Sequence, residues 1–343
     1  MTAARPTFAL HDLDAAVARA APALRELDGA ALLVTGATGF LGRWLLALLD
    51  RARAALGLDL AITALSRDPG AFAAAWPGLA APERVAWIAG DVREVAAPGR
   101  FSHVVHAATD TSLAADRDPE GLSTVIVDGT RRALAQARGA RLLYLSSGAV
   151  YGPQPPDLAH LPETFLGGPD PLDPRAAYAE AKRFAEGLCA RAAARGEVEA
   201  VIARGFAFSG PGLPLDGHFA IGNFVRDAVA GRPVRVAGDG TPVRSYLDAA
   251  DAAAWLVTLL AHGRPGAAYN LGSDRAVTIA ELAQLVAETV PGAVGFRIEG
   301  EADPGAARHR YVPAITRARD LGLDGWTPLE ESIRRMAAFA GRA

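Results

Sequence analysis

A glycine series between two apolar segments constrains this chain more than any other feature of its sequence. Gly36, Gly39 and Gly42 form a G-x-x-G-x-x-G series that follows the apolar run 30–34 and precedes the apolar-periodic stretch 44–49. This order predicts a strand, a glycine turn and a helix. Gly36 suits a tight turn, Gly39 lets the backbone approach a pyrophosphate, and Gly42 lets the helix pack closely on the strand. Because the free N–H groups at a helix start attract phosphate, the segment favours nucleotide binding over a merely glycine-rich connection.

The composition excludes several classes of protein. The chain has 343 residues with 35 basic and 38 acidic side chains, and no basic block indicates nucleic acid or a membrane surface as a partner. The longest apolar runs, such as 252–261, are too short to span a bilayer. His11, Asp12 and Asp14 interrupt the stretch where a signal peptide needs an apolar core. The single cysteine, Cys189, fits a reducing compartment, so we expect a cytoplasmic protein with no disulfide framework and no metal site.

Strands alternating with helices predict an α/β fold built on a Rossmann-type, doubly wound parallel sheet. After the first strand, further strands are expected at 60–65, 85–88, 103–107, 141–146 and 198–204. Helices are expected at 125–137, 175–195, 221–230, 248–262 and 277–290. We divide the chain into an N-terminal helical extension (1–29), a dinucleotide-binding domain (30–205) and a smaller, mainly substrate-binding lobe (206–343), with parts of 236–270 returning to the sheet. In the extension, Asp12 is expected to cap a helix that packs on the domain edge.

The end of the second strand bears on which dinucleotide is bound. In NAD-binding folds an acidic residue at this place holds the ribose 2′-hydroxyl. Here Ser66 and Arg67 occupy the place, and a hydroxyl beside a guanidinium fork suits a 2′-phosphate. Asp68 stands one residue too far along to act as the acid. These residues favour NADP over NAD, the alternative being a solvated Arg67. Asp91, after the third strand, is a candidate to bind the adenine amino group.

Tyr178 and Lys182 form a pair suited to proton transfer. Residues four apart on a helix share a face. A lysine charge stabilises the phenolate and lowers the tyrosine pKa, so the phenol can exchange a proton with an alcohol at neutral pH. Ser147 ends the fifth strand, beside the crevice where open α/β sheets bind ligands, and could orient the same oxygen. We expect His106, inside the fourth strand, to be buried and hydrogen-bonded rather than catalytic.

These motifs together resemble the extended short-chain dehydrogenase/reductases of the nucleotide-sugar epimerase/dehydratase group. The matching segments run in family order from about residue 31 to 335: 35–42, 90–92, 106–108, 146–152, 178–182, 238–240 with Arg244, and 269–273. The resemblance implies cofactor contacts from Gly36, Thr38, Gly39, Phe40, Leu41, Gly42, Ser66, Arg67, Asp91, Val92, Ala107, Ala108, Tyr178 and Lys182. It also implies a homodimer formed through two helices per subunit, here 124–137 and 175–195.

The resemblance further implies roles in catalysis and substrate binding. Tyr178 matches the catalytic acid/base, and Lys182 matches the residue that lowers its pKa and holds the nicotinamide ribose. Ser147 matches the Ser/Thr that binds the reacting sugar oxygen. Arg244 matches an arginine that clamps the nucleotide diphosphate. The candidate substrate contacts are Thr109, Ser147, Asn223, Arg244 and Arg308.

Two positions beside Ser147 depart from part of the family. Gly148 and Ala149 stand where 4,6-dehydratases carry an acidic pair, and the related sugar-acid decarboxylases usually carry a Glu in this segment. Elimination of water from C5/C6 therefore lacks its usual acid and base, so both activities are disfavoured.

The phosphate-clamping positions differ as well. Ala207 replaces an asparagine that reaches the diphosphate, and Ala220 replaces the asparagine usual at the start of the next helix, where Asn223 could substitute. Asp303 stands where a second phosphate-clamping arginine is common. The remaining candidates for that role are Arg308 and Arg310.

The resemblance implies hydride transfer between the nicotinamide and a sugar carbon, often C4 of a hexose, and it leaves several activities open. An epimerase and a 4-keto-sugar reductase would share Ser147, Tyr178 and Lys182. We place a nucleotide-sugar epimerase first because the overall pattern matches it most broadly. Ser66 and Arg67, in contrast, slightly favour an NADPH-dependent reductase. The altered clamps keep open a reductase of a non-nucleotide carbonyl substrate. A catalytically silent cofactor-binding protein is disfavoured, since the tyrosine and the lysine are both present.

Overall fold

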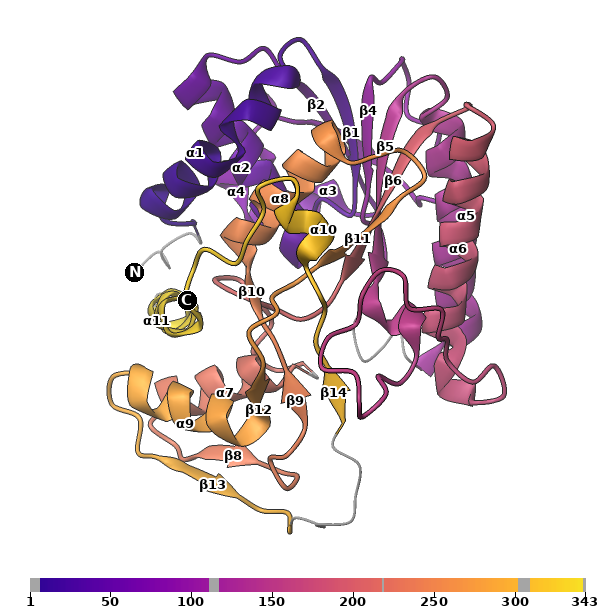
Figure 1. Cartoon of the computed structure of the whole chain (residues 1–343). Helices are drawn as coiled ribbons and strands as arrows, with labels where there is room; N and C mark the ends of the chain where they lie inside the picture. The colour runs from indigo at the N-terminus through magenta and orange to yellow at the C-terminus, as the bar shows by residue number, and fades with distance from the viewer. Residues whose placement is uncertain (1–6, 111–116, 218, 302–308, 342–343) are drawn as a thin grey trace.

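Seven parallel strands form the central sheet (Figure 1), in the order β11-β6-β5-β4-β1-β2-β3. The computed structural model describes residues 7–110, 117–217, 219–301 and 309–341. The strands are β1 (Ala31–Thr35), β2 (Ala61–Ser66), β3 (Ala86–Ala89), β4 (His103–His106), β5 (Arg141–Ser147), β6 (Glu199–Gly205) and β11 (Ala268–Leu271). The predicted doubly wound sheet is confirmed. The strand order reverses beside β1, whose neighbours are β2 and β4, and such a reversal opens a ligand crevice at the carboxyl ends of the strands.

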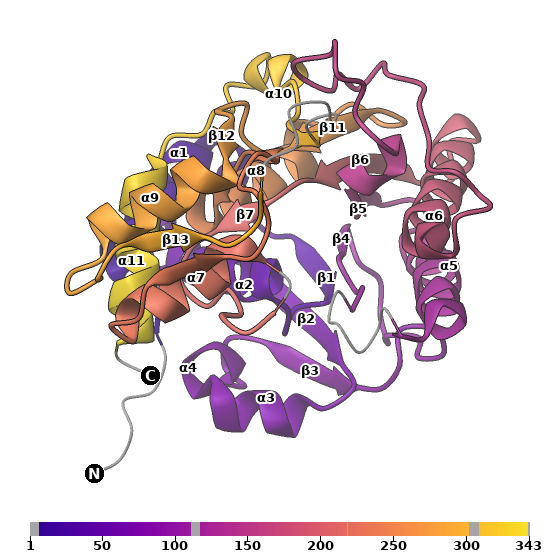
Figure 2. The ribbon, with the colours of Figure 1, turned by 90° about the horizontal axis from the view of Figure 1, so that it is seen from below.

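Helices cover both faces of the sheet. Helices α2 (Phe40–Leu56) and α8 (Ala249–His262) pack on one face, and α5 (Pro119–Gln136) and α6 (Ala177–Ala194) pack on the other. Figure 2 shows α5 and α6 together on one side of the sheet and α2 on the opposite side. Residues 249–260 of α8 are all buried, because this apolar helix lies between the sheet and a further helix, α1 (Leu10–Glu26).

The N-terminal helix packs on α8 and α2 as expected, but the prediction of its cap was wrong. Ala9 occupies the N-cap position, and no side chain there accepts a hydrogen bond from the helix start. Asp12 lies within the first turn and is buried, with its carboxylate 3.1 Å from the guanidinium of Arg335. Asp12, which the local sequence predicts to cap the helix, instead forms an ion pair with Arg335, a residue distant in the sequence.

The C-terminal lobe has a separate apolar core. Helices α7 (Ala220–Val229), α9 (Ile279–Thr289) and α11 (Leu329–Ala340) pack with the strand pair β8 (Val234–Val236) and β13 (Phe296–Ile298). A small sheet joins β9 (Val243–Arg244), β12 (Val277–Thr278) and β14 (Arg310–Tyr311). After β14 the chain runs to α10 (Thr316–Arg319), which contacts β11 at the edge of the main sheet (Figure 1).

The remaining elements are short. The connection after β2 folds into α3 (Pro69–Ala75) and α4 (Pro77–Ala80), and β5 and α6 are each adjoined by a 3₁₀ turn, at Gly148–Tyr151 and Pro174–Ala176. Strands β7 (Phe208–Ser209) and β10 (Leu247–Asp248) pair with each other. The segments that follow residue 205 therefore return in part to the main sheet: β11 joins its edge, and α8 packs on one of its faces.

Candidate functional site

The glycine turn between β1 and α2 has no room for a side chain at two of its glycines. Gly36 has φ +75°, and a Cβ there would lie 2.4 Å from the carbonyl of Ala107, just beyond β4. A Cβ at Gly42 would lie 2.2 Å from the carbonyl oxygen of Gly36. The structure thus gives Gly36 the tight turn and Gly42 the close helix packing that the sequence predicts. Ala107 and Ala108 border the same turn from β4.

The start of α2 suits a diphosphate. Gly39 is the N-cap residue, no side-chain oxygen of the described residues caps the helix, and its first turn carries no acidic residue. Thr38, Phe40 and Leu41 stand at this start, where backbone N–H groups and the helix dipole favour an anion. A turn with no room for a Cβ at Gly36 or Gly42, and a helix start without a side-chain cap, fit the diphosphate of a dinucleotide.

At the expected adenosine end, Asp68 already has a structural role. Its carboxylate accepts a hydrogen bond from the backbone N–H of Ala71 at 2.8 Å and so caps α3. Ser66 ends β2, and Arg67 beside it has a side chain that is 78% exposed. A guanidinium nitrogen of Arg67 lies 3.8 Å from the carboxylate of Asp110. This long ion pair with Asp110 is one that a phosphate could replace.

Asp91 after β3 is already engaged by Arg93. The arginine donates to both carboxylate oxygens, at 2.8 and 2.9 Å, and its hydrogen bond is the main cause that lowers the Asp91 pKa. An adenine amino group would share this carboxylate with Arg93. Val92, the next residue, lies close to Gly129 of α5.

His106 is buried and hydrogen-bonded, as predicted. Its Nδ1 lies 2.7 Å from the hydroxyl of Thr35, and its Nε2 lies 3.2 Å from the hydroxyl of Thr130. Burial, aided by the nearby charge of Lys182, lowers the His106 pKa to about 3. The imidazole therefore stays neutral at physiological pH and serves the packing of β4 against β1 and α5.

Lys182, the only lysine in the chain, is buried on α6. Its ammonium donates to the hydroxyl of Thr109 at 2.9 Å and to the carbonyl oxygen of Leu145 at 2.7 Å. The ammonium lies 4.9 Å from the ring centroid of Tyr144 and 6.0 Å from that of Tyr178. Burial lowers the pKa of Lys182 from its ordinary value of 10.5 to about 7. The structure thus brings Tyr178 and Lys182 to one face, and it gives Thr109 a contact with the lysine.

Ser147 closes β5 and turns the chain into the following 3₁₀ turn. Its hydroxyl oxygen accepts a hydrogen bond from the backbone N–H of Ala149 at 3.1 Å. The hydroxyl of Tyr311, a residue of β14 that sequence reasoning missed, lies beside the next residue, Gly148, and donates to the carbonyl oxygen of Gly205 at 3.4 Å. The aromatic ring of Tyr311 packs on Phe206 with ring centroids 4.5 Å apart.

A buried charged pair supports the end of β5, and sequence reasoning missed it too. Glu186 accepts hydrogen bonds from the hydroxyl of Ser146 at 2.6 Å and from two nitrogens of Arg204 at 3.0 and 2.7 Å. Glu186 follows Lys182 by one helical turn, so the spacing 178, 182, 186 was a signal for a third polar residue on this face.

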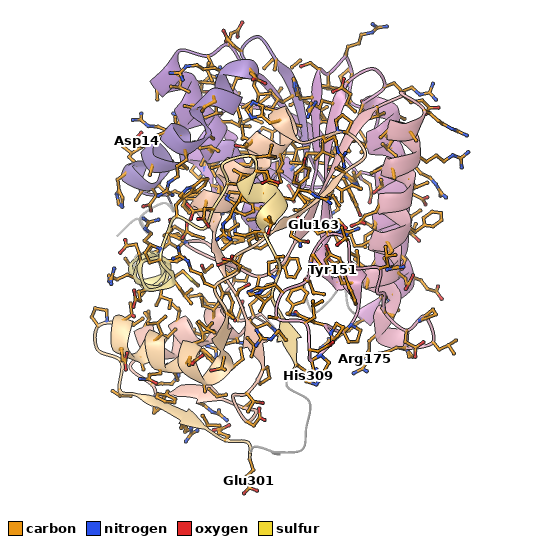
Figure 3. The ribbon with its side chains drawn as sticks, viewed as in Figure 1. Asp14, Tyr151, Glu163, Arg175, Glu301 and His309 are labelled. Atoms are coloured by element: carbon orange, nitrogen blue, oxygen red, sulfur yellow. The ribbon has the colours of Figure 1, made fainter. Side chains whose placement is uncertain are left out.

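A second layer of polar contacts continues outward from Arg204. Its guanidinium lies 4.7 Å from the ring centroid of Tyr151, whose hydroxyl donates to the Asn270 side chain at 2.7 Å. The backbone N–H of Asn270 donates to the Glu163 carboxylate at 3.0 Å. Figure 3 labels Tyr151 and Glu163 in this central region, between the main sheet and the C-terminal lobe. These contacts tie the ends of β5, β6 and β11 to the loop that follows the 3₁₀ turn.

The expected substrate contacts of the C-terminal lobe have partners within the lobe. Asn223 on α7 donates to the carbonyl oxygen of Gly217 at 3.0 Å and accepts from Arg226 at 3.1 Å. Arg244 on β9 donates to the carbonyl oxygens of Val243 and His309, at 2.9 and 3.3 Å. Arg308 and the segment 303–306 lie outside the described residues.

Comparison with known proteins identifies the family. The model of the NAD dependent epimerase/dehydratase family matches residues 32–272. The chain belongs to this family, and the resemblance to extended short-chain dehydrogenase/reductases is confirmed.

Individual relatives show how far the likeness extends. UDP-glucuronic acid decarboxylase 4 of Arabidopsis thaliana is 37% identical over 199 residues, which cover 57% of this chain and 42% of that protein. The match to UDP-glucuronic acid decarboxylase 1 of Xenopus tropicalis is 32% over 205 residues, or 59% and 47% of the two chains. The match thus spans less than half the length of each of these curated relatives.

Solved structures share the fold over almost the whole chain. UDP-glucose 4-epimerase of Thermotoga maritima, solved with UDP-glucose, has a TM-score of 0.76 at 19% identity and covers 91% of this chain and 99% of its own. The protein RMD of Pseudomonas aeruginosa, complexed with NADPH, has a TM-score of 0.73 at 26% identity and covers 92% and 100%.

Two further findings concern the described residues only. In that part of the chain, no group of three or more His, Cys, Asp or Glu side chains is placed to hold a metal ion. No helix within those same residues has the length and apolar character needed to cross a membrane.

Proposed function

We propose that this protein is an NAD(P)-dependent nucleotide-sugar epimerase that acts at a sugar hydroxyl carbon, C4, with Tyr178 as the acid/base. The observation that carries the proposal is the buried Lys182, held by Thr109 and the Leu145 carbonyl on the face of α6 that bears Tyr178. Burying an ammonium costs stability, and such perturbed groups gather at functional sites. Membership of the epimerase/dehydratase family supports the reaction class.

Each side chain has a separate task in this reaction. Tyr178 accepts the proton of the sugar hydroxyl and returns a proton to the same oxygen. The charge of Lys182 stabilises the phenolate, and Ser147 donates a hydrogen bond to the reacting oxygen. The glycine turn would hold the diphosphate of the cofactor, and Lys182 its nicotinamide ribose. When bound, the nicotinamide supplies the acceptor and donor of a hydride at the sugar carbon.

Dehydration and decarboxylation have less support, although the two curated relatives named above are decarboxylases. Gly148 and Ala149 carry no carboxyl group, and a Cβ at position 148 would lie 2.5 Å from the hydroxyl of Tyr311 and 2.8 Å from the ring of Phe206. The end of β5 therefore has neither the acid of those activities nor space for one.

An NADPH-dependent 4-keto-sugar reductase is the second candidate. One observation favours it: Asp68 caps α3, which leaves Ser66 and the exposed Arg67 at the ribose end. We propose NADP as the preferred cofactor on the same ground. Replacing Arg67 with Ala should weaken NADP binding and leave NAD binding nearly unchanged, measured by titration calorimetry. Arg84→Ala, which removes an ion pair with Asp50, is the control. NADP affinity unchanged by Arg67→Ala would refute this contact.

The decisive experiment for the reaction class compares two tyrosines. Wild type, Tyr178→Phe and Tyr269→Phe are assayed for interconversion of UDP-, dTDP-, CDP- and GDP-hexoses, and the ligand retained on purification is identified by mass spectrometry. Tyr178→Phe should lose at least about 10²-fold in kcat, as expected for a general acid/base. Tyr269→Phe, which removes a hydroxyl bonded to the Arg264 backbone, should keep its activity. Full activity of Tyr178→Phe would contradict the proposal.

Thermal shifts separate the remaining alternatives. Stabilisation by UDP, GDP, CDP or dTDP is expected for a nucleotide-sugar enzyme, since a bound ligand raises Tm. No shift with any of them would favour a reductase of a non-nucleotide carbonyl compound. Binding of NAD(P) without any turnover would favour a silent cofactor-binding protein.

We also propose a cytoplasmic homodimer formed through α5 and α6. Arg131 of α5 lies over the ring of Phe184 of α6 at 5.9 Å, and Phe184 is 54% exposed. Phe184→Asp should shift light-scattering mass from dimer to monomer. Val294→Asp, at an exposed apolar position in the C-terminal lobe, should not. A wild-type monomer would refute the assembly.

A further inference from the structure

The aromatic ring of Tyr144 lies against the buried ammonium of Lys182. Tyr144 belongs to β5, is 1% exposed, and packs among apolar residues of α5 and α6. The Nζ of Lys182 lies over this ring, 4.9 Å from its centroid, whereas the ring centroid of Tyr178 is 6.0 Å away. A cation over the face of an aromatic ring is attracted by the electron-rich face when it comes within about 6 Å of the centroid. The Tyr144 ring is therefore the closer of two aromatic partners of the ammonium.

Two neutral acceptors account for part of the hydrogen bonding of this ammonium. A lysine ammonium has three N–H donors. One donates to the hydroxyl of Thr109 at 2.9 Å and another to the carbonyl oxygen of Leu145 at 2.7 Å. Because the side chain of Lys182 is buried, bulk water does not solvate its charge. A nearby source of negative potential therefore matters more here than at the protein surface.

The carboxylate that follows Lys182 on the same helix is engaged elsewhere. Glu186 lies one turn further along α6, and its charge favours the protonated form of Lys182. Its carboxylate, however, forms an ion pair with Arg204 at 2.7 Å and accepts from the hydroxyl of Ser146 at 2.6 Å. Since the positive charge of Arg204 offsets that of Glu186, this pair provides little net stabilisation of the ammonium.

The other titratable groups packed around the ring are neutral at physiological pH. The imidazole of His106 on β4 stacks on Tyr144 with centroids 5.7 Å apart, and burial lowers the His106 pKa to about 3. Burial raises the pKa of the Cys189 thiol on α6 to about 12 and that of Tyr144 well above its ordinary value of 10. Tyr144 therefore presents the face of a neutral phenol ring to Lys182.

We propose that Tyr144 is a positioning residue, whose ring face holds the Lys182 ammonium in its charged form on the helix face that bears Tyr178. The inference rests on the proposed function, in which the charge of Lys182 stabilises the Tyr178 phenolate. Tyr144 acts through Lys182 and does not itself exchange a proton with the substrate.

Fluorination of the ring tests this contact while keeping nearly the same shape. Tyr144→Phe retains the ring face and is the reference, and mono-, di- and trifluorinated phenylalanine are placed at position 144 by stop-codon suppression. Each fluorine withdraws electron density from the ring face. The titration midpoint of Lys182, the only lysine, is followed by ¹³C NMR of the apoprotein.

The midpoint should fall stepwise along the fluorinated series. We expect Tyr144→Phe to titrate near 7, like the wild type, and the trifluorinated variant about one pKa unit lower, the size of a desolvated cation–π contact. A midpoint that stays constant across the series would overturn the inference.

Tyr269 of β11 supplies the matched control. Its ring is also buried in the main sheet, but it faces the guanidinium of Arg317 at 5.9 Å. The same fluorinated residues at position 269 should leave the Lys182 midpoint unchanged. A fall of the Lys182 midpoint that both series share would mark a general effect of fluorine on the fold and would count against the proposal.

The pH profile of turnover links the contact to the reaction. If Lys182 must be charged, its deprotonation in the free enzyme limits kcat/KM on the alkaline side. With UDP-glucose, UDP-galactose and the other nucleotide hexoses, this limb should move about one pH unit lower in the trifluorinated variant than in Tyr144→Phe. An alkaline limb that stays in place while the NMR midpoint falls would overturn the role of Tyr144 in the reaction. A wild type that converts no nucleotide hexose would refute the proposed function, while the NMR series still decides whether Tyr144 holds the ammonium.

Discussion

Lys182 of α6 and Thr109, just beyond β4, are joined by a hydrogen bond of 2.9 Å between Nζ and Oγ1. Thr109→Val keeps the shape of the side chain and removes this acceptor, so the ammonium loses one of its two hydrogen bonds to residues that the structure describes. We expect kcat to fall about tenfold, since a hydrogen bond to a charged group is worth about 1.5–3 kcal/mol. Steady-state kinetics on the nucleotide hexose that the wild type converts measures the effect.

The control for Thr109→Val is Thr124→Val on α5. The Thr124 hydroxyl donates to the carbonyl oxygen of Glu120 within its own helix and is exposed. Its removal should leave kcat unchanged. If Thr109→Val raises only KM for the sugar nucleotide, Thr109 contacts substrate, as the sequence predicted, and does not position Lys182.

The buried lysine should make stability depend on pH. Burial lowers the Lys182 pKa to about 7, whereas the unfolded chain titrates near 10.5. Between these values the unfolded state binds more protons, so the free energy of unfolding rises with pH. Lys182→Met should lose this rise, which amounts to about 2 kcal/mol between pH 7 and pH 9. Urea unfolding at both pH values measures the difference between the two proteins.

The same pKa can be read directly, because Lys182 is the only lysine in the chain. Labelling with ¹³C-lysine gives one side-chain signal, whose titration midpoint should lie near 7 in the apoprotein. A midpoint near 10.5 would show an accessible, solvated ammonium and would remove the basis of the stability prediction.

Local sequence patterns were enough to predict the main sheet and the shared helix face of Tyr178 and Lys182. The strands of the sheet coincide with apolar runs of the sequence. Tyr178 and Lys182 lie near each other because residues four apart share a helix face. Helix α11 was missed although Leu329, Ile333, Met336 and Ala337 repeat at helical spacing, with three of them buried. The spacing of these apolar residues is enough to predict a helix here.

The contacts around Ser147 lie beyond what local patterns encode. Tyr311 stands on a two-residue strand, too short for any periodicity, and reaches Gly148 and Gly205 through the pairing of β14 with β9. Glu186 joins Arg204 across two elements. The Asp12 cap failed for the same reason, since the opposing charge comes from a helix near the other end of the chain.

Gly36→Ala tests the cradle at the start of α2. Left-handed backbone costs an alanine about 1–2 kcal/mol, and at Gly36 the added Cβ would also lie 2.4 Å from the Ala107 carbonyl. We expect a loss of about 3 kcal/mol or more in unfolding free energy and a large loss of NAD(P) affinity.

Gly57→Ala separates the two causes. Gly57 ends α2 with φ +67°, and no atom of the described residues lies within 4 Å of an added Cβ, so the backbone strain applies without a steric clash. It should cost about 1 kcal/mol and leave cofactor affinity intact. Equal losses at the two glycines would mean that the contact with Ala107 contributes nothing.

A buried charge cluster joins both ends of the chain to α8 and should respond to pH. Arg335 of α11 lies 3.1 Å from Asp12 and 3.8 Å from Asp248, and Glu331 lies 3.2 Å from the same guanidinium. Burial is the main cause that raises the pKa of Asp12 and of Asp248, and it raises that of the adjacent Asp251 to about 6. A carboxyl whose pKa is raised in the folded state adds stability at low pH, where it is protonated. For Asp251 that added stability is lost as the pH rises through about 6.

Arg335→Met should therefore destabilise the protein more at pH 7.5 than at pH 5. At pH 7.5 it leaves ionised, buried carboxylates without their cation, which costs about 3 kcal/mol. At pH 5 the loss should be smaller, because the raised pKa values of Asp12 and Asp248 make it easier for these carboxyls to take up protons. Arg334→Met, one residue earlier with a side chain 56% exposed, should change stability little at either pH. Denaturant unfolding of wild type, Arg335→Met and Arg334→Met at both pH values measures these differences in unfolding free energy. An equal loss for Arg335→Met at pH 5 and pH 7.5 would show that Arg335 contributes by packing rather than by compensating charge.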